Sequence, residues 1–275
     1  MKIRNIITLT FLLLFVSQLS HSQYKIRYIT ADDGLARNHI YHIFRDSRGF
    51  MWFSTAKGLD RFDGYDFIHF NSYNRENPLP NDVVHCVNED KNGNLWIGTE
   101  NGLYFYEYKT GEIADASVKI RPGNSSLKQN IRFISRDESG QLWIGHDTGL
   151  TTISGNSQGS YSSENVFGSN TVESVVFNNG NIYVGADNDV FRLIKTNDLK
   201  YNRVDSDEKI QNLAGTVNIL FNDKNFLWIG TSSGLYRYDL NTEEIKHYQH
   251  IQGNNFSLSS DAVTDIARNN EGQIL

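Results

Sequence analysis

Apolar residues recur along the chain in pairs that lie three positions apart, and an Asp or Asn follows each pair three positions later. These sets are Ile40/Ile43/Asp46, Val84/Val87/Asp90, Ile131/Ile134/Asp137, Val172/Val175/Asn178, Val217/Leu220/Asp223 and Val263/Ile266/Asn269. Because side chains alternate along a strand, a spacing of three puts the two apolar residues on opposite faces. Both faces are therefore expected to be covered, as in a blade packed between two neighbours. We predict that this is the innermost strand of each unit.

A turn and an aromatic strand follow each of these strands. The spacing Asp-x-x-Gly at 46–49 and 90–93 predicts a hairpin turn, because Asp can accept from the backbone two residues on and Gly tolerates positive φ. The next strand has a Trp-Ile-Gly core, and its aromatic residues are Trp52, Trp96, Trp143, Tyr183 and Trp228. The glycines that allow a neighbouring backbone or ring to approach closely are Gly98, Gly145 and Gly230. A third and a more variable fourth strand complete the unit.

The unit occurs five times in tandem, with 40 to 47 residues between successive aromatic positions. Strand-type repeats of about 40 to 50 residues are typical of propeller blades, whereas helical repeats would show a 3.6-residue period that is absent here. We therefore predict an all-β fold, a β-propeller of five four-stranded blades plus the start of a sixth, incomplete and open in this chain. The predicted blades span 38–72, 82–118, 128–157, 170–205 and 215–250. A partial blade at 261–275 and a closing strand at 24–30 belong to the same domain, 23–275.

Residues 1–22 have the features of a secretory signal peptide. Lys2 and Arg4 precede an apolar run at 6–16, and small and polar residues follow it. The run is too short to span a bilayer but fits the apolar region of a signal peptide. A retained anchor or a lipoprotein signal is the alternative, although no cysteine lies near Ser22 to carry a lipid. We therefore expect an exported chain.

The charge balance argues against nucleic-acid and membrane-surface partners. The net charge is −6, and removal of residues 1–22 takes away two positive charges and no negative ones, so the chain becomes more negative. Such a chain lacks the clustered Lys and Arg that bind phosphate backbones or anionic lipids. Its single cysteine, Cys86, excludes an intrachain disulfide and is expected to be a small buried residue.

Three short motifs resemble functional sites, but the repeat accounts for them. GTSSG at 230–234 matches a nucleophile elbow, which needs a helix after the turn, whereas a strand is predicted here. NEDKNG at 88–93 matches half of a calcium loop but has Thr99 in place of the bidentate glutamate. His39 and His42 should point to opposite faces of a strand unless a bulge intervenes. We predict no catalytic residue, no metal and no cofactor, and a glycosidase pair of carboxylates stays open.

The repeat Asp-x-x-Gly-x-Leu-Trp-Ile-Gly-Thr-x-x-Gly-Leu-x-x-Tyr/Phe resembles the two-component regulator propeller repeat, and so does the segment 28–64. The resemblance covers residues 24–275. Tyr183 and Asp189 depart from it, so the fourth blade is degenerate. In that family such blades form the periplasmic sensor of hybrid two-component proteins. A β-domain, one membrane helix, a histidine kinase and often a response regulator with a DNA-binding domain follow the sensor.

The resemblance implies a periplasmic, carbohydrate-sensing propeller of a phosphorelay, with an oligosaccharide as its ligand and a homodimer as the full-length form. No enzyme activity is expected in this chain. We expect a truncation before the membrane helix and the kinase, with membrane attachment only through that missing part. A secreted propeller enzyme or a lectin-like module that acts on polysaccharide is the alternative.

A ligand is expected on the rim where the links between blades meet the turns between second and third strands. The long links lie at 71–82, 119–130 and 200–209. Sugar recognition uses aromatic platforms beside polar side chains with fixed donors. The candidates of this kind are Tyr73, Arg75, Arg121, Tyr201 and Arg203.

Overall fold

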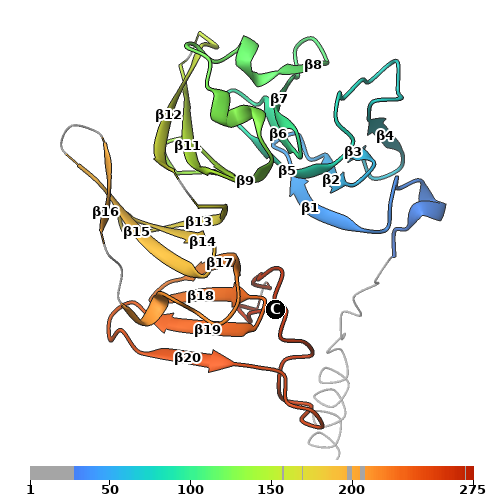
Figure 1. Ribbon diagram of the computed structural model, residues 1–275. Coiled ribbons are helices and arrows are strands. Elements are labelled where there is room, and N and C mark those ends of the chain that lie inside the picture. The colour runs from blue at the N-terminus through green and yellow to red at the C-terminus, as the bar shows by residue number, and fades with distance from the viewer. Residues whose placement is uncertain (1–27, 157, 169, 197–199, 205–207, 270) are drawn as a thin grey trace, which may run out of the picture.

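The computed structural model in Figure 1 consists of five four-stranded antiparallel sheets arranged around a common axis. It describes residues 28–275 except 157, 169, 197–199, 205–207 and 270. The predicted all-β propeller is confirmed, and its five blades form an open arc. In every blade the strands follow one another in chain order from the axis outward. Within the described part of the chain, no helix is long and apolar enough to cross a membrane.

Each blade repeats the same four-strand meander, and short 3-10 helices lie before or between blades. The first blade consists of β1 (Ile40–Arg45), β2 (Met51–Thr55), β3 (Gly58–Phe62) and β4 (Phe67–Phe70). The second and third blades consist of β5 (Val84–Glu89), β6 (Leu95–Thr99), β7 (Gly102–Glu107), β8 (Glu112–Asp115), β9 (Ile131–Arg136), β10 (Leu142–His146), β11 (Gly149–Gly155) and β12 (Tyr161–Gly168). The fourth and fifth blades consist of β13 (Val172–Asn178), β14 (Asn181–Ala186), β15 (Asp189–Lys195), β16 (Tyr201–Val204), β17 (Val217–Asp223), β18 (Phe226–Thr231), β19 (Gly234–Asp239) and β20 (Ile245–Tyr248). The 3-10 helices are η1 (Ala31–Asp33), η2 (Ala116–Val118), η3 (Ser125–Lys128) and η4 (Glu208–Ile210).

Two predicted boundaries differ from the structure. The third blade continues to Gly168 instead of ending at 157, because the N–H of Asn156 bonds to the carbonyl of Ser160 at 2.9 Å and the chain returns into β12. Residues 28–30 of the expected closing strand are not in a strand, and the Thr30 side chain caps η1 instead. Residues 24–27 and the expected signal peptide lie outside the described residues, so both of these assignments stay predictions.

The Asp of the Asp-x-x-Gly turn fixes both the hairpin and the tryptophan behind it. In the second blade one oxygen of Asp90 accepts the N–H groups of Asn92 and Asn94 at 2.8 and 3.0 Å. The other oxygen accepts Nε1–H of Trp96 at 3.1 Å, and Tyr161 of the third blade donates its hydroxyl to it at 2.5 Å. Because Asp90 and Trp96 are buried, these bonds explain why the repeat keeps the two residues at a fixed spacing.

The same arrangement recurs in the first and third blades but not in the last two. The equivalent Asp–Trp bonds are Asp46–Trp52 at 2.8 Å and Asp137–Trp143 at 3.0 Å. In the fifth blade the turn is one residue shorter, because Asp223 pairs directly with Phe226. Asp223 is therefore one residue closer in sequence to Trp228 than Asp90 is to Trp96. Nε1 of Trp228 is buried and has no hydrogen-bond partner among the described residues. The shorter turn therefore removes the bond that holds the tryptophan elsewhere.

The glycine after each Trp-Ile pair makes room for an inner strand, as predicted from the sequence. A Cβ added to Gly98 would lie 2.5 Å from Sγ of Cys86 and 2.7 Å from Cγ2 of Ile131 in the next blade. Approaches of the same kind, 2.4 and 2.6 Å, occur at Gly145 and Gly230. Side chains at these positions would push adjacent blades apart, so the glycines set how closely the blades pack.

Candidate functional site

The structure does not bring the five predicted ligand residues together. Tyr73 and Arg75 lie in the link after β4 and are exposed, Tyr73 by 87%. Arg121 donates its backbone N–H to the carbonyl of Tyr161 at 3.0 Å. Tyr161 begins β12 and lies beside the turn that contains Asp90. This turn is at one end of the blades, and the link that contains Tyr73 is at the opposite end, so Arg121 and Tyr73 lie apart.

Tyr201 and Arg203 belong to strand β16, so the prediction that they lie in a loop is wrong. The ring of Tyr201 packs edge-on against Trp143 at 4.9 Å, and its hydroxyl donates to Oε1 of Gln141 at 3.1 Å. The guanidinium of Arg203 lies 3.6 Å from the ring centroid of Phe191. Both side chains therefore take part in the packing of the third and fourth blades. The strand is short and polar, which is why its sequence resembles a loop.

Each of the five innermost strands contains a β-bulge at the same place. Between β1 and β2 the register passes from the pair Ile40/Thr55 to the pair His42/Ser54, so that one residue has no partner in the ladder. The unpaired residues of the five strands are Tyr41, His85, Arg132, Glu173 and Asn218. A bulge turns a side chain out of the regular alternation of a strand, and bulges are common beside functional sites.

All five bulged residues line one cavity of about 620 Å³ at the axis of the propeller. Figure 1 shows why they meet, since β1, β5, β9, β13 and β17 are the strands that face this axis. Further lining comes from the same strands, from His39 directly before β1, and from Thr264 and Asp265 in the segment after the fifth blade. Its volume is that of a small-molecule site, and every blade contributes to it.

One guanidinium lies close to two carboxylates on one side of this axial cavity. Nε of Arg132 donates to Oδ1 of Asp147 at 2.8 Å, and it lies 4.0 Å from Oε1 of Glu173. Asp147 comes from the turn between β10 and β11 and is tied to the cavity through Arg132. Burial raises the pKa of Glu173, and Arg132 opposes that shift. The carboxylates outnumber the guanidinium, so the cavity has an excess of negative charge.

Aromatic rings form another side of the axial cavity. The ring centroids of His39 and Tyr41 are 5.0 Å apart, and those of Tyr41 and His85 are 5.3 Å apart, both edge-on. Tyr41 is 44% exposed and therefore accessible to a ligand. Burial lowers the pKa of His42 and of His85, so both imidazoles are neutral at pH 7. Nε2 of His85 makes no hydrogen bond of good geometry in the described residues, although the amide of Asn130 is close enough to raise its pKa.

The bulge corrects the expected orientation of His39 and His42. Their spacing predicts opposite faces, but the bulge at Tyr41 breaks the alternation, and both histidines line the axial cavity together with the residues between them. In the described ranges no group of three or more His, Cys, Asp or Glu side chains is placed to hold a metal ion. Cys86 is buried, as predicted, and burial raises the pKa of its thiol, which makes it a poor nucleophile. The lining is thus suited to hydrogen bonding with a polar ligand.

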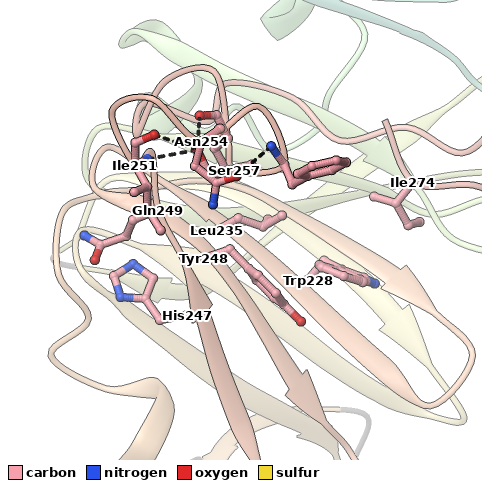
Figure 2. A pocket seen from close by; sticks show the side chains of 11 residues that line it. Trp228, Leu235, His247, Tyr248, Gln249, Ile251, Asn254, Ser257 and Ile274 are labelled. Atoms are coloured by element: carbon pink, nitrogen blue, oxygen red, sulfur yellow. Dashed lines mark hydrogen bonds between the residues drawn. The ribbon is translucent and has the colours of Figure 1, made fainter.

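A second cavity, of about 480 Å³, lies against the fifth blade (Figure 2). Trp228 and Tyr248 lie stacked in it with ring centroids 6.2 Å apart, close to the loop that contains Asn254. In the second blade the equivalent Trp96 is covered by Tyr161 of the following blade at 5.0 Å. Within the described residues Trp228 has no such cover. This cavity is therefore an uncovered packing face of a blade, and the axial cavity is the better candidate for a site.

The five bulged residues are not among the predicted ligand residues, although the sequence contains a signal for them. The position after the first apolar residue of each pair is Tyr, His, Arg, Glu or Asn in successive blades, while the residue before it stays apolar. A position that serves only packing keeps similar residues in every repeat. A polar residue that changes from blade to blade, directly after a position that is apolar in every blade, indicates a site to which all the blades contribute.

The family model of the two component regulator propeller matches residues 34–57 and 78–101. No curated protein sequence matches the chain. The extracellular domain of the hybrid two component system BT3049 from B. thetaiotaomicron is similar over 92% of this chain and 40% of its own, with a TM-score of 0.67 and 21% identity. The extracellular domain of the hybrid two component system BT4673 from the same organism is similar over 92% of this chain and 38% of its own, with a TM-score of 0.57 and 20% identity. A virginiamycin B lyase from Staphylococcus aureus is similar over 78% of this chain and 71% of its own, with a TM-score of 0.56 and 15% identity.

Likeness at 15 to 21% identity shows the fold, and this chain spans about two fifths of the two extracellular domains. The two matched segments lie in the first and second blades. Each contains the inner strand, the Asp-x-x-Gly turn and the aromatic strand. The chain therefore carries the two-component regulator propeller repeat, as its sequence predicts, in a propeller fold like that of these extracellular domains.

Proposed function

We propose that this chain is the ligand-sensing propeller of a hybrid two-component signal-transduction protein and that the axial cavity is its ligand site. The observation that carries the proposal is the ring of five bulged residues, which are polar, differ from blade to blade and converge on one cavity. Extracellular domains of hybrid two component systems have the same fold, which supports a position outside the cytoplasm.

The ligand class that we propose is carbohydrate, in the form of a short oligosaccharide. Sugar hydroxyls both donate and accept, and the cavity offers both kinds of partner. Glu173 supplies acceptor oxygens, Arg132 supplies donors, and the neutral His85 can do either. The exposed ring of Tyr41 offers an apolar face for a sugar ring. The volume of about 620 Å³ is ample for such a ligand.

We further propose that the sensor works in the periplasm and passes its signal to a histidine kinase in the rest of a longer, homodimeric protein. The support is the propeller repeat itself and the likeness to domains that are more than twice as long as this chain. Membrane attachment and the kinase would belong to that further part. The described residues contribute recognition only.

Isothermal titration calorimetry of the full chain against digests of plant, algal and microbial polysaccharides tests the sensing function. We expect saturable binding of one digest without turnover of the sugar. The variant Tyr41→Ala should weaken that binding, because it removes the aromatic face of the cavity. Tyr73→Ala is the matched control, since Tyr73 is exposed and lies in a link away from the axis. A panel in which no saccharide binds contradicts the proposal.

A secreted propeller enzyme is the second candidate, because Glu173 and Asp265 place two carboxylates in one cavity. Two carboxylates are the usual machinery of glycoside hydrolysis, and a lyase shares this fold. An enzyme would release reducing ends from the digest that binds, and Glu173→Gln would abolish that release. Binding with no product over an extended incubation favours the sensor.

A further inference from the structure

Resting on the proposed function, we propose that the axial cavity selects neutral saccharides and rejects saccharides that carry a carboxylate or a sulfate. The selection would come from the charges of Arg132, Glu173 and Asp265 in the lining and of Asp147, which pairs with Arg132. It concerns which oligosaccharides bind, and it adds a specificity to the sensing site.

The single cationic side chain of the lining is already paired. Arg132 is the one Lys or Arg that lines the cavity within the described residues. Its Nε donates to Asp147 at 2.8 Å and lies 4.0 Å from Glu173. A ligand carboxylate would have to compete with two protein carboxylates for this guanidinium. Displacing either of them would leave a half-buried charge without its partner, which costs free energy.

The histidines of the lining do not replace the missing positive charge. Burial lowers the pKa of His42, and the charge of Asp265 only partly offsets this. Burial and Arg132 lower the pKa of His85, against smaller opposing effects of Glu100 and Asp147. A neutral imidazole offers one donor and one acceptor, which suits a hydroxyl group better than an anion.

Two carboxylates reach the cavity from different segments of the chain. Glu173 belongs to β13 in the fourth blade, and Asp265 to the segment after the fifth blade. A ligand in the cavity therefore lies beside two negative groups. A like charge there is repelled by both, whereas a hydroxyl donates a charge-assisted hydrogen bond to either.

The test compares the saccharide that binds in the calorimetric panel with the same saccharide oxidised at C6, where each primary alcohol becomes a carboxylate. We expect the oxidised form to bind the full chain at least about tenfold more weakly, because like charges across an interface repel. Methyl esterification of the oxidised form removes the charge and should restore most of the affinity.

Variants locate the effect in the cavity. Glu173→Gln combined with Asp265→Asn keeps the shape of both side chains and removes both charges. This variant should reduce the difference between neutral and oxidised sugar to less than about threefold, since the repulsion is lost. Glu112→Gln is the matched control, because Glu112 is exposed on the outer strand β8 and should leave the ratio unchanged. Thermal melting checks that each variant is folded, and Glu173→Gln alone replaces the double variant if that variant unfolds.

The outcomes separate the two proposals. If the panel shows binding but the oxidised form binds as tightly as the neutral one, charge selection is overturned and the sensing function stands. The same holds if the tightest ligand of the panel is acidic, or if the double variant leaves the ratio unchanged. If no saccharide of either kind binds, both proposals fall.

Discussion

The carboxylate of Asp90 should contribute more to the free energy of unfolding than the side chain of any exposed turn residue. Asp90→Ala removes the acceptor of four hydrogen bonds, two from the turn and one each from Trp96 and Tyr161. Burial and the Asp90 carboxylate raise the pKa of Tyr161 to about 12, so its phenol stays a donor at neutral pH. Both the indole N–H and this hydroxyl would then be buried without an acceptor.

The expected cost follows from those two donors. A buried donor left unsatisfied costs about 1–3 kcal/mol, and the two turn N–H groups, which can reach water, add about 1 kcal/mol together. We therefore expect Asp90→Ala to lower the free energy of unfolding by about 3–7 kcal/mol. Asn156→Ala is the matched control, because Asn156 caps an exposed turn through Gln158 and Ser160 but holds no tryptophan or tyrosine. It should cost about 1 kcal/mol or less.

Urea unfolding followed by tryptophan fluorescence measures both variants in one assay. Tyr161→Phe, combined with Asp90→Ala in a double-mutant cycle, isolates the bond between blades and should give a coupling of about 1–2 kcal/mol. Equal costs for Asp90→Ala and Asn156→Ala, or a coupling near zero, would refute the argument that the Asp–Trp–Tyr contact joins the blades.

Three more predictions concern packing and pH. Trp96→Ala should cost about 3–5 kcal/mol in the same urea assay, and Trp228→Ala clearly less, because Trp228 is partly exposed and lacks the Asp bond; equal losses contradict this. Gly98→Ala should cost about 1–3 kcal/mol through its clash with Cys86, whereas Gly123→Ala, where no atom lies within 4 Å, should cost almost nothing. Among the described residues, burial lowers the pKa of His42, His85 and His146 from 6.5. Below about pH 6.5 these imidazoles bind protons in the unfolded chain but not in the folded one. The free energy of unfolding should therefore fall as the pH drops from about 6.5 toward the lowered pKa values of the folded state. A free energy of unfolding that stays constant between about pH 7.5 and 5.5 would count against the burial of these histidines.

The sequence is informative where one residue type performs the same physical task in most blades. Trp96 and its equivalents fill the space between blades, Asp90 caps the hairpin, and Gly98 admits the next inner strand. These demands recur from blade to blade, so they appear as a period and predict the fold. The fourth strand has no such fixed task, and this is why β16 with Tyr201 has the sequence of a loop.

The candidate site is harder to predict because it depends on register. Alternation along the inner strand would send neighbouring side chains to opposite faces, but a bulge at Tyr41 or Arg132 breaks that alternation. A bulge is set by how one strand pairs with the next, and no single residue type encodes it. The polar variation at these positions is visible in the sequence, but their convergence on the axis is a property of the assembled blades.

The most direct test of the central claim is to ask which face of the propeller holds the ligand. Calorimetry with the saccharide found in the panel would compare an axial variant, Tyr41→Ala with His85→Ala, and a peripheral variant, Tyr73→Ala with Arg75→Ala and Arg121→Ala. Our account predicts that the peripheral variant binds like the unmodified chain and that the axial variant loses about tenfold or more in affinity, as when central contacts of a site are removed. Binding that is lost in the peripheral variant and kept in the axial variant, with both proteins folded, would contradict it.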